Sequence, residues 1–174
     1  MKRPKALIFF LGLPALLMLL SSCPDKSNEI TASAIHLTAE GSDFRGVNIG
    51  DSPGVVSSTE FAKSVYTMPD ELIYRIEVDK KDSAWYEINY GFGEEGLNNI
   101  ELSVFMPKGD QATSLKNEFR ALYSERYGEC HVHDEFCSWS TITSNGKNAL
   151  IYLKEPVIVA DKMKLVVQFR EATP

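Results

Sequence analysis

Side chains able to bind metal or to form a disulfide gather in one short stretch of the 174-residue chain. The segment Cys130-His131-Val132-His133-Asp134-Glu135-Phe136-Cys137 holds two of the three histidines and two of the three cysteines. Thiolates and imidazoles suit zinc or copper, so one interpretation is a metal-binding or redox site. Its ligands would be Cys130, His131, His133 and Cys137. A Cys130–Cys137 disulfide is favoured, because this spacing matches no standard zinc motif.

Catalytic patterns find little support elsewhere in the chain. Residues 91–96 match G-x-G-x-x-G, but that dinucleotide pattern works by opening a helix whose amides meet a pyrophosphate. Residues 97–105 have the alternation of a strand, so we predict a glycine-rich β-turn at 91–96. The chain has no G-x-S-x-G and no H-E-x-x-H, and we expect the isolated His36 to be solvated. We therefore expect no enzyme activity and no cofactor.

The N-terminal residues predict export. Lys2, Arg3 and Lys5 precede the 15-residue apolar run ALIFFLGLPALLMLL, an order typical of a signal peptide, here over residues 1–22. A membrane-spanning helix needs roughly 20 apolar residues, so this run is short for an uncleaved anchor. It ends in Leu20-Ser21-Ser22-Cys23, which resembles the lipobox of bacterial lipoproteins.

By that resemblance, Cys23 is lipidated and becomes the first residue of the mature protein. It would carry a diacylglyceryl thioether and an N-acyl chain such as palmitate, and stable anchoring requires more than one chain. The protein would then lie on the periplasmic side of the outer or inner membrane. Two cysteines remain, and an even pair in an exported protein is expected to form a disulfide.

The charge balance excludes one class of partner. The whole chain has a net charge of −6, but without Lys2, Arg3 and Lys5 it has 15 basic and 24 acidic residues, a net charge of −9. Nucleic-acid binding draws its affinity from basic patches, so we expect no nucleic-acid partner. An acidic surface could instead steer a cationic enzyme or toxin toward an inhibitor or immunity-type protein.

Periodicity gives the elements that must position these residues. Residues 23–41 are polar and predict a flexible tether with a short strand at its end, and residues 42–174 predict one domain. The expected elements are a strand over 44–50, a helix with Val55, Thr59, Ala62 and Tyr66 on one face, strands over 72–78, 84–92 and 100–106, a helix over 110–128 with a stripe of Leu115, Phe119, Leu122 and Tyr123, and strands over 137–143, 148–154 and 163–170. This order predicts an α+β fold, with two helices packed on one face of an antiparallel meander sheet.

Trp85 is the candidate for a binding residue. In the strand over 84–92, Tyr86 and Tyr90 share one parity and Trp85 has the other. Trp85 therefore belongs to the face opposite the helices, where an exposed tryptophan can anchor a protein partner. Most other aromatic residues on these strands are expected in the core.

A second resemblance concerns the mature domain. Residues 46–53, Gly-Val-Asn-Ile-Gly-Asp-Ser-Pro, followed by a helix with Val55 and Val56, look like the opening of small envelope lipoproteins of the SmpA/OmlA type. Those proteins have two helices on an antiparallel sheet, as β-lactamase-inhibitor-like domains do, although Asp51 stands where they tend to have an apolar residue. The resemblance implies a binding or assembly module, with another envelope protein as partner. It carries over no functional residue.

Overall fold

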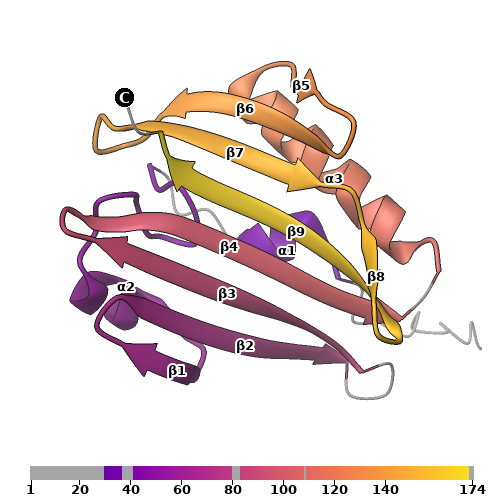
Figure 1. The fold of residues 1–174 in the computed structure, drawn as a ribbon, viewed down its shortest axis with the longest axis horizontal. Coiled ribbons are helices and arrows are strands. Elements are labelled where there is room, and N and C mark those ends of the chain that lie inside the picture. The colour runs from indigo at the N-terminus through magenta and orange to yellow at the C-terminus, as the bar shows by residue number, and fades with distance from the viewer. Residues whose placement is uncertain (1–29, 37–40, 80–82, 108, 173–174) are drawn as a thin grey trace, which may run out of the picture.

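Alternating apolar residues produce long strands in the computed structural model, which describes residues 30–36, 41–79, 83–107 and 109–172. The predicted signal peptide, Cys23 and residues 24–29 of the predicted tether lie outside these ranges. The elements are α1 (Ala32–His36), α2 (Pro53–Thr59), β1 (Ser64–Met68), β2 (Glu71–Asp79), β3 (Ala84–Gly93), β4 (Gly96–Pro107), α3 (Gln111–Tyr127), β5 (His131–Val132), β6 (Phe136–Ile142), β7 (Asn148–Lys154), β8 (Val157–Val159) and β9 (Lys162–Glu171). The fold is mixed α+β, with an antiparallel sheet that dominates a few helices (Figure 1).

The strands of the described chain form one sheet in the order β1-β2-β3-β4-β9-β7-β6-β5, with β8 paired to β9 beside this path. Every pairing is antiparallel. Each half is a meander, but the second half runs in reverse order, so that β9 and not β5 lies beside β4. The prediction of one continuous meander is therefore wrong. The physical reason is α3, a 17-residue helix that is about 25 Å long and carries the chain to the far edge of the sheet.

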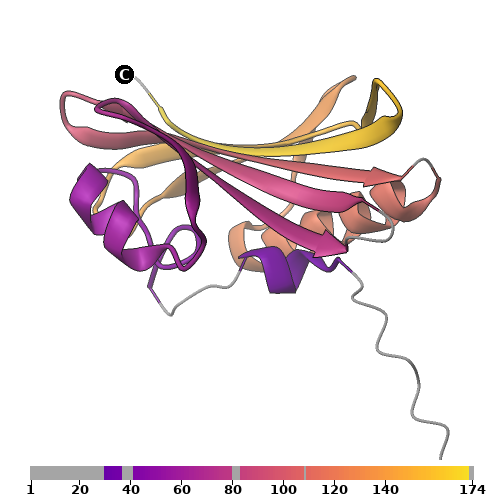
Figure 2. The ribbon, with the colours of Figure 1, turned by 90° about the horizontal axis from the view of Figure 1, so that it is seen from below.

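The helix predicted between Asp110 and Gly128 is confirmed as α3, although the Asp110 side chain does not cap it as expected. Its buried side chains Ala112, Leu115, Phe119 and Tyr123 recur at helical spacing and face the sheet. The helix stops at Gly128, whose φ of 87° is a conformation that other residues rarely adopt. Figure 2 shows α1, α2 and α3 on the same side of the sheet.

The first predicted helix is shorter than its periodicity suggested, and it buries a different face. Ser52 caps α2 through a bond from Val55 N to its hydroxyl, but the helix ends at Thr59, and Tyr66 belongs to strand β1. Val56 is the buried residue of α2, whereas Val55 is 44% exposed. The helix stops early because the following residue, Glu60, is extended, and its carboxylate is drawn into the core by Arg45.

The segment before α2 also differs from prediction. Residues 44–50 form no strand; they make a tight turn closed by the bridge between Phe44 and Val47. The Ser64–Met68 strand was not predicted, because its residues were assigned to the end of the helix. In residues 44–50, Phe44, Val47 and Ile49 are all fully buried, so this segment packs in the core without pairing as a strand.

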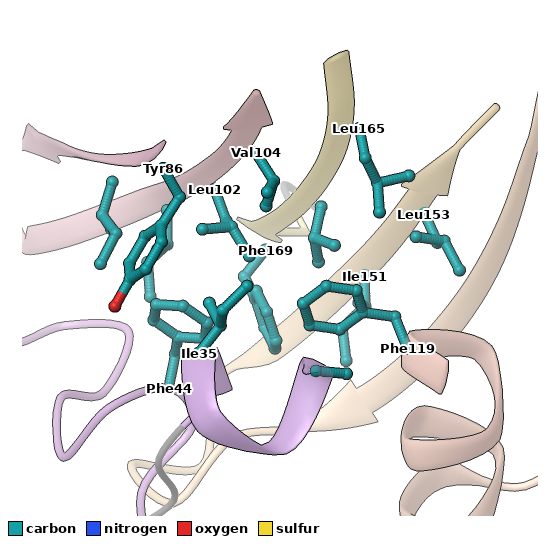
Figure 3. Close-up of a cluster of buried hydrophobic side chains, with 14 of the residues drawn as sticks. Ile35, Phe44, Tyr86, Leu102, Val104, Phe119, Ile151, Leu153, Leu165 and Phe169 are labelled. Carbon is teal, nitrogen blue, oxygen red and sulfur yellow. The ribbon is translucent and has the colours of Figure 1, made fainter. Parts of the chain in front are cut away.

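Part of the predicted tether belongs to the folded body. Residues Ala32–His36 form helix α1, and Ala32, Ile35 and His36 are buried. Ile35 packs with Phe44 and Phe169 beneath the sheet (Figure 3), in a core that contains buried side chains of the helices and of both halves of the sheet. Helix α1 therefore interrupts the predicted flexible tether, and the buried side chain of Ile35 packs this helix against the core.

His36 is buried, contrary to the expectation that it would be solvated. It is 1% exposed, and Arg126 Nη1 and Tyr123 Oη lie 3.3 Å from its Nε2 and Nδ1. Because a guanidinium only donates, Nε2 accepts, and Nδ1 carries the proton of a neutral imidazole. Burial, with the charges of Arg126 and Arg45, lowers the pKa of His36 from 6.5 to about 4. The tether prediction failed here because these partners lie far away in sequence.

Candidate functional site

One face of the sheet is free of helices in the described chain, and we call it the open face. Side chains alternate along a strand, so every second residue of the sheet points away from α1, α2 and α3 (Figure 2). By the register of the strands, the open face consists of Glu71, Ile73, Arg75 and Glu77 of β2, Trp85, Glu87 and Asn89 of β3, Asn99, Glu101, Ser103 and Phe105 of β4, Phe136, Ser138 and Ser140 of β6, Leu150, Tyr152 and Lys154 of β7, and Lys162, Lys164, Val166, Gln168 and Arg170 of β9.

Trp85 lies on the open face, as the alternation of its strand predicts. It is paired across the sheet with Phe105 of β4, and the two rings stack with centroids 5.0 Å apart and planes at 18°. The Arg75 guanidinium lies 5.8 Å from the centroid of the Trp85 ring, and Lys162 Nζ lies 5.2 Å from it. Trp85 is consequently half-buried and not fully exposed. Cations held against an aromatic face in this way attract its π-electrons.

The indole N–H of Trp85 has no hydrogen-bond partner. Its Nε1 atom is buried, and it is the one such side-chain atom found without a partner in the part of the chain that the structure describes. A buried donor left unpaired costs roughly 1–3 kcal/mol. Trp85 thus combines a large apolar surface with an unpaired donor, on a face that none of the described helices covers.

The cations around Trp85 are only partly neutralised. Arg75 Nε donates to Glu87 Oε1 at 2.8 Å, and Lys164 Nζ lies 3.7 Å from Glu101 Oε1. Within the described ranges, no ion pair engages Lys162. The open face as a whole carries the cations Arg75, Lys154, Lys162, Lys164 and Arg170 and the acids Glu71, Glu77, Glu87 and Glu101. This near balance contrasts with the acidic composition of the chain, so the open face is not the acidic surface that would steer a cationic partner.

The loop that contains Cys130 and Cys137 lies beside β5 and β6, at the edge of the sheet farthest from β1. Cys130 and Cys137 are joined by a disulfide with Cα atoms 5.8 Å apart, the pairing that the sequence favoured. The disulfide removes both thiolates from the alternative metal site. The other two candidate ligands, His131 and His133, are exposed. His133 stacks on Phe136 with ring centroids 4.3 Å apart. Nowhere in the described residues do three or more His, Cys, Asp or Glu side chains come together as a metal site would require.

The glycine-rich segment is a hairpin turn, as predicted. β3 ends at Gly93 and β4 begins at Gly96, so no helix follows the G-x-G-x-x-G pattern. The hairpin docks on the loop before α2, since Gly50 N donates to Leu97 O at 2.7 Å and Leu97 N donates to Asp51 O at 2.8 Å. A Cβ at Gly96 would lie 2.4 Å from the Gly50 carbonyl oxygen, which explains the glycine. The segment docks the sheet on this loop, and no helix N-terminus follows the glycines to meet a phosphate.

A buried group of charged and polar side chains on the helix side was not foreseen from the sequence. Arg45 and Glu60 form a salt bridge at 2.9 Å with side chains 7% and 1% exposed, and Tyr90 donates to the same carboxylate. Burial, followed by the Glu60 charge, raises the pKa of Tyr90 well above its ordinary value. Arg45 also donates to the Ile35 carbonyl at 2.9 Å. Each group is engaged and shielded from solvent, so the cluster ties α1 and Glu60 to β3 and offers no open reaction site.

Comparison with known proteins adds no assignment. No protein-family model matches the chain, and no curated protein or solved structure matches it with significance. No helix among the described residues is both long enough and apolar enough to span a membrane. The described residues form an antiparallel α+β fold in which helices cover one face of the sheet and none of the described helices covers the other.

Proposed function

We propose that this chain is a lipid-anchored protein of the bacterial envelope that binds another envelope protein without catalysing a reaction. The binding surface would be the open face around Trp85. The observation that carries this proposal is the unpaired, buried indole N–H of Trp85 within a stack of Trp85 and Phe105 flanked by Arg75 and Lys162.

Binding energy at protein interfaces is concentrated in a few residues, and tryptophan and arginine are enriched among them. A partner that moves aside the side chains covering Trp85 Nε1 and supplies an acceptor would satisfy a donor that the free protein leaves unpaired. The ring stack is already formed, so little side-chain freedom would be lost on binding. These features support recognition of a protein surface more than attack on a substrate.

The finer architecture that we propose is a scaffold of two principal helices, α2 and α3, packed on one face of the sheet. Such a scaffold would hold the open face rigid for its partner. The lipobox resemblance at Leu20-Ser21-Ser22-Cys23 supports anchoring through Cys23, on the periplasmic side of the outer or inner membrane. More than one acyl chain would make that anchoring stable.

The binding proposal is tested by crosslinking and pull-down from membranes. The wild-type protein should recover one protein partner, and Trp85→Ala should weaken that complex by about 30-fold or more, as expected for an interface hot spot worth about 2 kcal/mol. Trp85→Phe keeps a ring but loses the N–H, and should weaken it about fivefold, which is roughly 1 kcal/mol. The matched control is Phe61→Ala, which removes a ring that is 95% exposed and not part of the open face. Equal capture by Trp85→Ala and wild type would refute the proposed site.

Anchoring has its own test. Cells grown with a palmitate analogue should label the wild-type protein and not Cys23→Ala. An unlabelled wild-type protein would refute the lipid anchor while leaving binding by the open face to be judged by the pull-down.

A further inference from the structure

Strand β8 exposes three consecutive apolar side chains. Val157, Ile158 and Val159 are 51%, 65% and 44% exposed, so neither face of this short strand packs on the core. Proteins usually protect edge strands with charge, because exposed apolar edges invite association. β8 carries no charged residue. An exposed apolar strand of this kind is a candidate contact surface.

Two lysines lie beside this apolar strand. In the β8–β9 hairpin, Val159 pairs with Lys162 and Val157 pairs with Lys164. Asp161 is the acidic residue of the hairpin, and Glu101 of β4 lies 3.7 Å from Lys164 Nζ. Apolar residues next to lysines and aromatic rings are the composition of protein surfaces that lie in a membrane interface.

The described chain begins at the same end of the sheet. Ile30 lines a pocket of about 340 Å³ together with Val78 of β2 and Tyr86 of β3. The next residue along β3, Trp85, aligns through Phe105 with Lys164 of β9. Figure 1 shows the end of β2, the start of β9 and β8 together at one end of the sheet. The start of the described chain and the β8–β9 hairpin therefore share this end.

The length of chain before Ile30 limits how far this end can be from an anchor. Cys23 precedes Ile30 by seven residues, and an extended chain spans at most about 3.5 Å per residue, or about 25 Å in all. A lipid on Cys23 would keep this end of the domain within about 25 Å of the bilayer. Headgroups of anionic lipids attract nearby lysines by about 1 kcal/mol each.

We propose that the β8–β9 hairpin, residues 157–164, contacts the membrane surface through Val157, Ile158 and Val159, with Lys162 and Lys164, which lie at the border between the hairpin and the open face, near anionic headgroups. This inference rests on the proposed anchoring at Cys23. It orients the domain with its long strands rising from the bilayer. The open face would then be perpendicular to the membrane plane, where a partner can approach it from the side.

The test uses the mature lipidated protein in vesicles of phosphatidylglycerol and phosphatidylcholine. Ile158→Cys introduces a thiol for an environment-sensitive fluorophore, since Cys130 and Cys137 are disulfide-bonded and Cys23 would be acylated in the lipidated protein. The matched control is Ile142→Cys, an isoleucine 71% exposed at the end of β6. That residue precedes the turn whose Lys147 contacts Glu95 of the β3–β4 hairpin, at the end of the sheet opposite β8. The label at 158 should shift to the blue and be quenched by lipid-borne quenchers, and the label at 142 should do neither.

The outcomes separate this inference from the proposed function. Protein that sediments with vesicles while the label at 158 stays in water keeps its anchor and refutes membrane contact by β8. Shielding that appears in native membranes but not in pure lipid would identify a protein occupant and also overturn the proposal. Protein that remains in the supernatant, with both labels in water, refutes anchoring and contact together. Reversing Lys162 and Lys164 to glutamate should reduce the shift at 158 on anionic vesicles and not on neutral ones.

Discussion

Acid should destabilise this protein through His36, and the structure gives the size of the effect. The imidazole is neutral and buried, with Arg126 against one nitrogen and Tyr123 against the other. Protonation would place a second positive charge beside Arg126 and near Arg45. His36 joins α1 to α3, so the strain falls on the docking of the N-terminal helix.

The folded pKa of His36 is about 4, against 6.5 for an unperturbed histidine. As the pH falls, the unfolded chain therefore binds its proton first, so this contribution to stability is complete above pH 6.5 and is lost progressively toward pH 4. A difference of about 2.5 units at 1.36 kcal/mol per unit amounts to about 3 kcal/mol. Asp43, whose pKa is raised by burial, acts in the opposite sense over the acidic range.

The measurement is urea unfolding at pH 7.5, 6, 5 and 4, comparing the wild type with His36→Gln. The amide can still accept from Arg126 but does not titrate, so the wild type should lose about 3 kcal/mol more than the variant between pH 7.5 and 4. Contributions from Asp43 and other carboxylates are common to both proteins and cancel. His131→Gln, at an exposed position, should follow the wild type. Parallel curves for wild type and His36→Gln would refute a buried neutral histidine.

Three further changes test the packing. Glu60→Gln leaves Arg45 buried without its counter-ion and should lower the free energy of unfolding in urea by about 3–5 kcal/mol. Glu155→Gln, at an exposed ion pair, should lower it by under about 1 kcal/mol. Similar losses for the two variants would contradict the burial argument. Gly96→Ala should destabilise by roughly 2–4 kcal/mol, because its Cβ would meet the Gly50 carbonyl at 2.4 Å and its φ is 102°; an unchanged melting temperature would exclude that contact. Reducing the Cys130–Cys137 disulfide should lower the free energy of unfolding by about 2.5 kcal/mol, the loop-closure entropy of so short a ring. Calorimetry with and without reductant measures this difference.

Much of the sheet and the long helix could be predicted from local pattern. Residues 84–92 alternate because one face is buried, and the apolar stripe of α3 has helical spacing for the same reason. The Asn145-Gly146 pair between β6 and β7 and the glycines between β3 and β4 carry turn chemistry within a few residues. Trp85 was placed on the correct face by parity alone. Its unpaired N–H could not be foreseen, because that depends on neighbours from other strands.

The remainder of the fold depends on contacts between distant residues. Arg45 and Glu60 look like solvated charges in the sequence, and His36 looks like part of a polar tether, yet each is buried by partners elsewhere in the chain. Glu60 also ends α2 against the helical period that runs on to Tyr66. The reversal of the second half of the sheet follows from the path of α3, which no local pattern encodes.

The position of β9 has a consequence for how the domain folds. This strand bonds β4 on one side and β7 on the other, and it is made after every other strand. Without β9, strands β1–β4 and strands β5–β7 share no strand pairing, so the two halves of the sheet cannot form their common core. Contacts that span so much sequence form slowly. The two halves of the sheet therefore gain their shared backbone bonds only through the last strand of the described chain, and loss of β9 would leave two unjoined half-sheets.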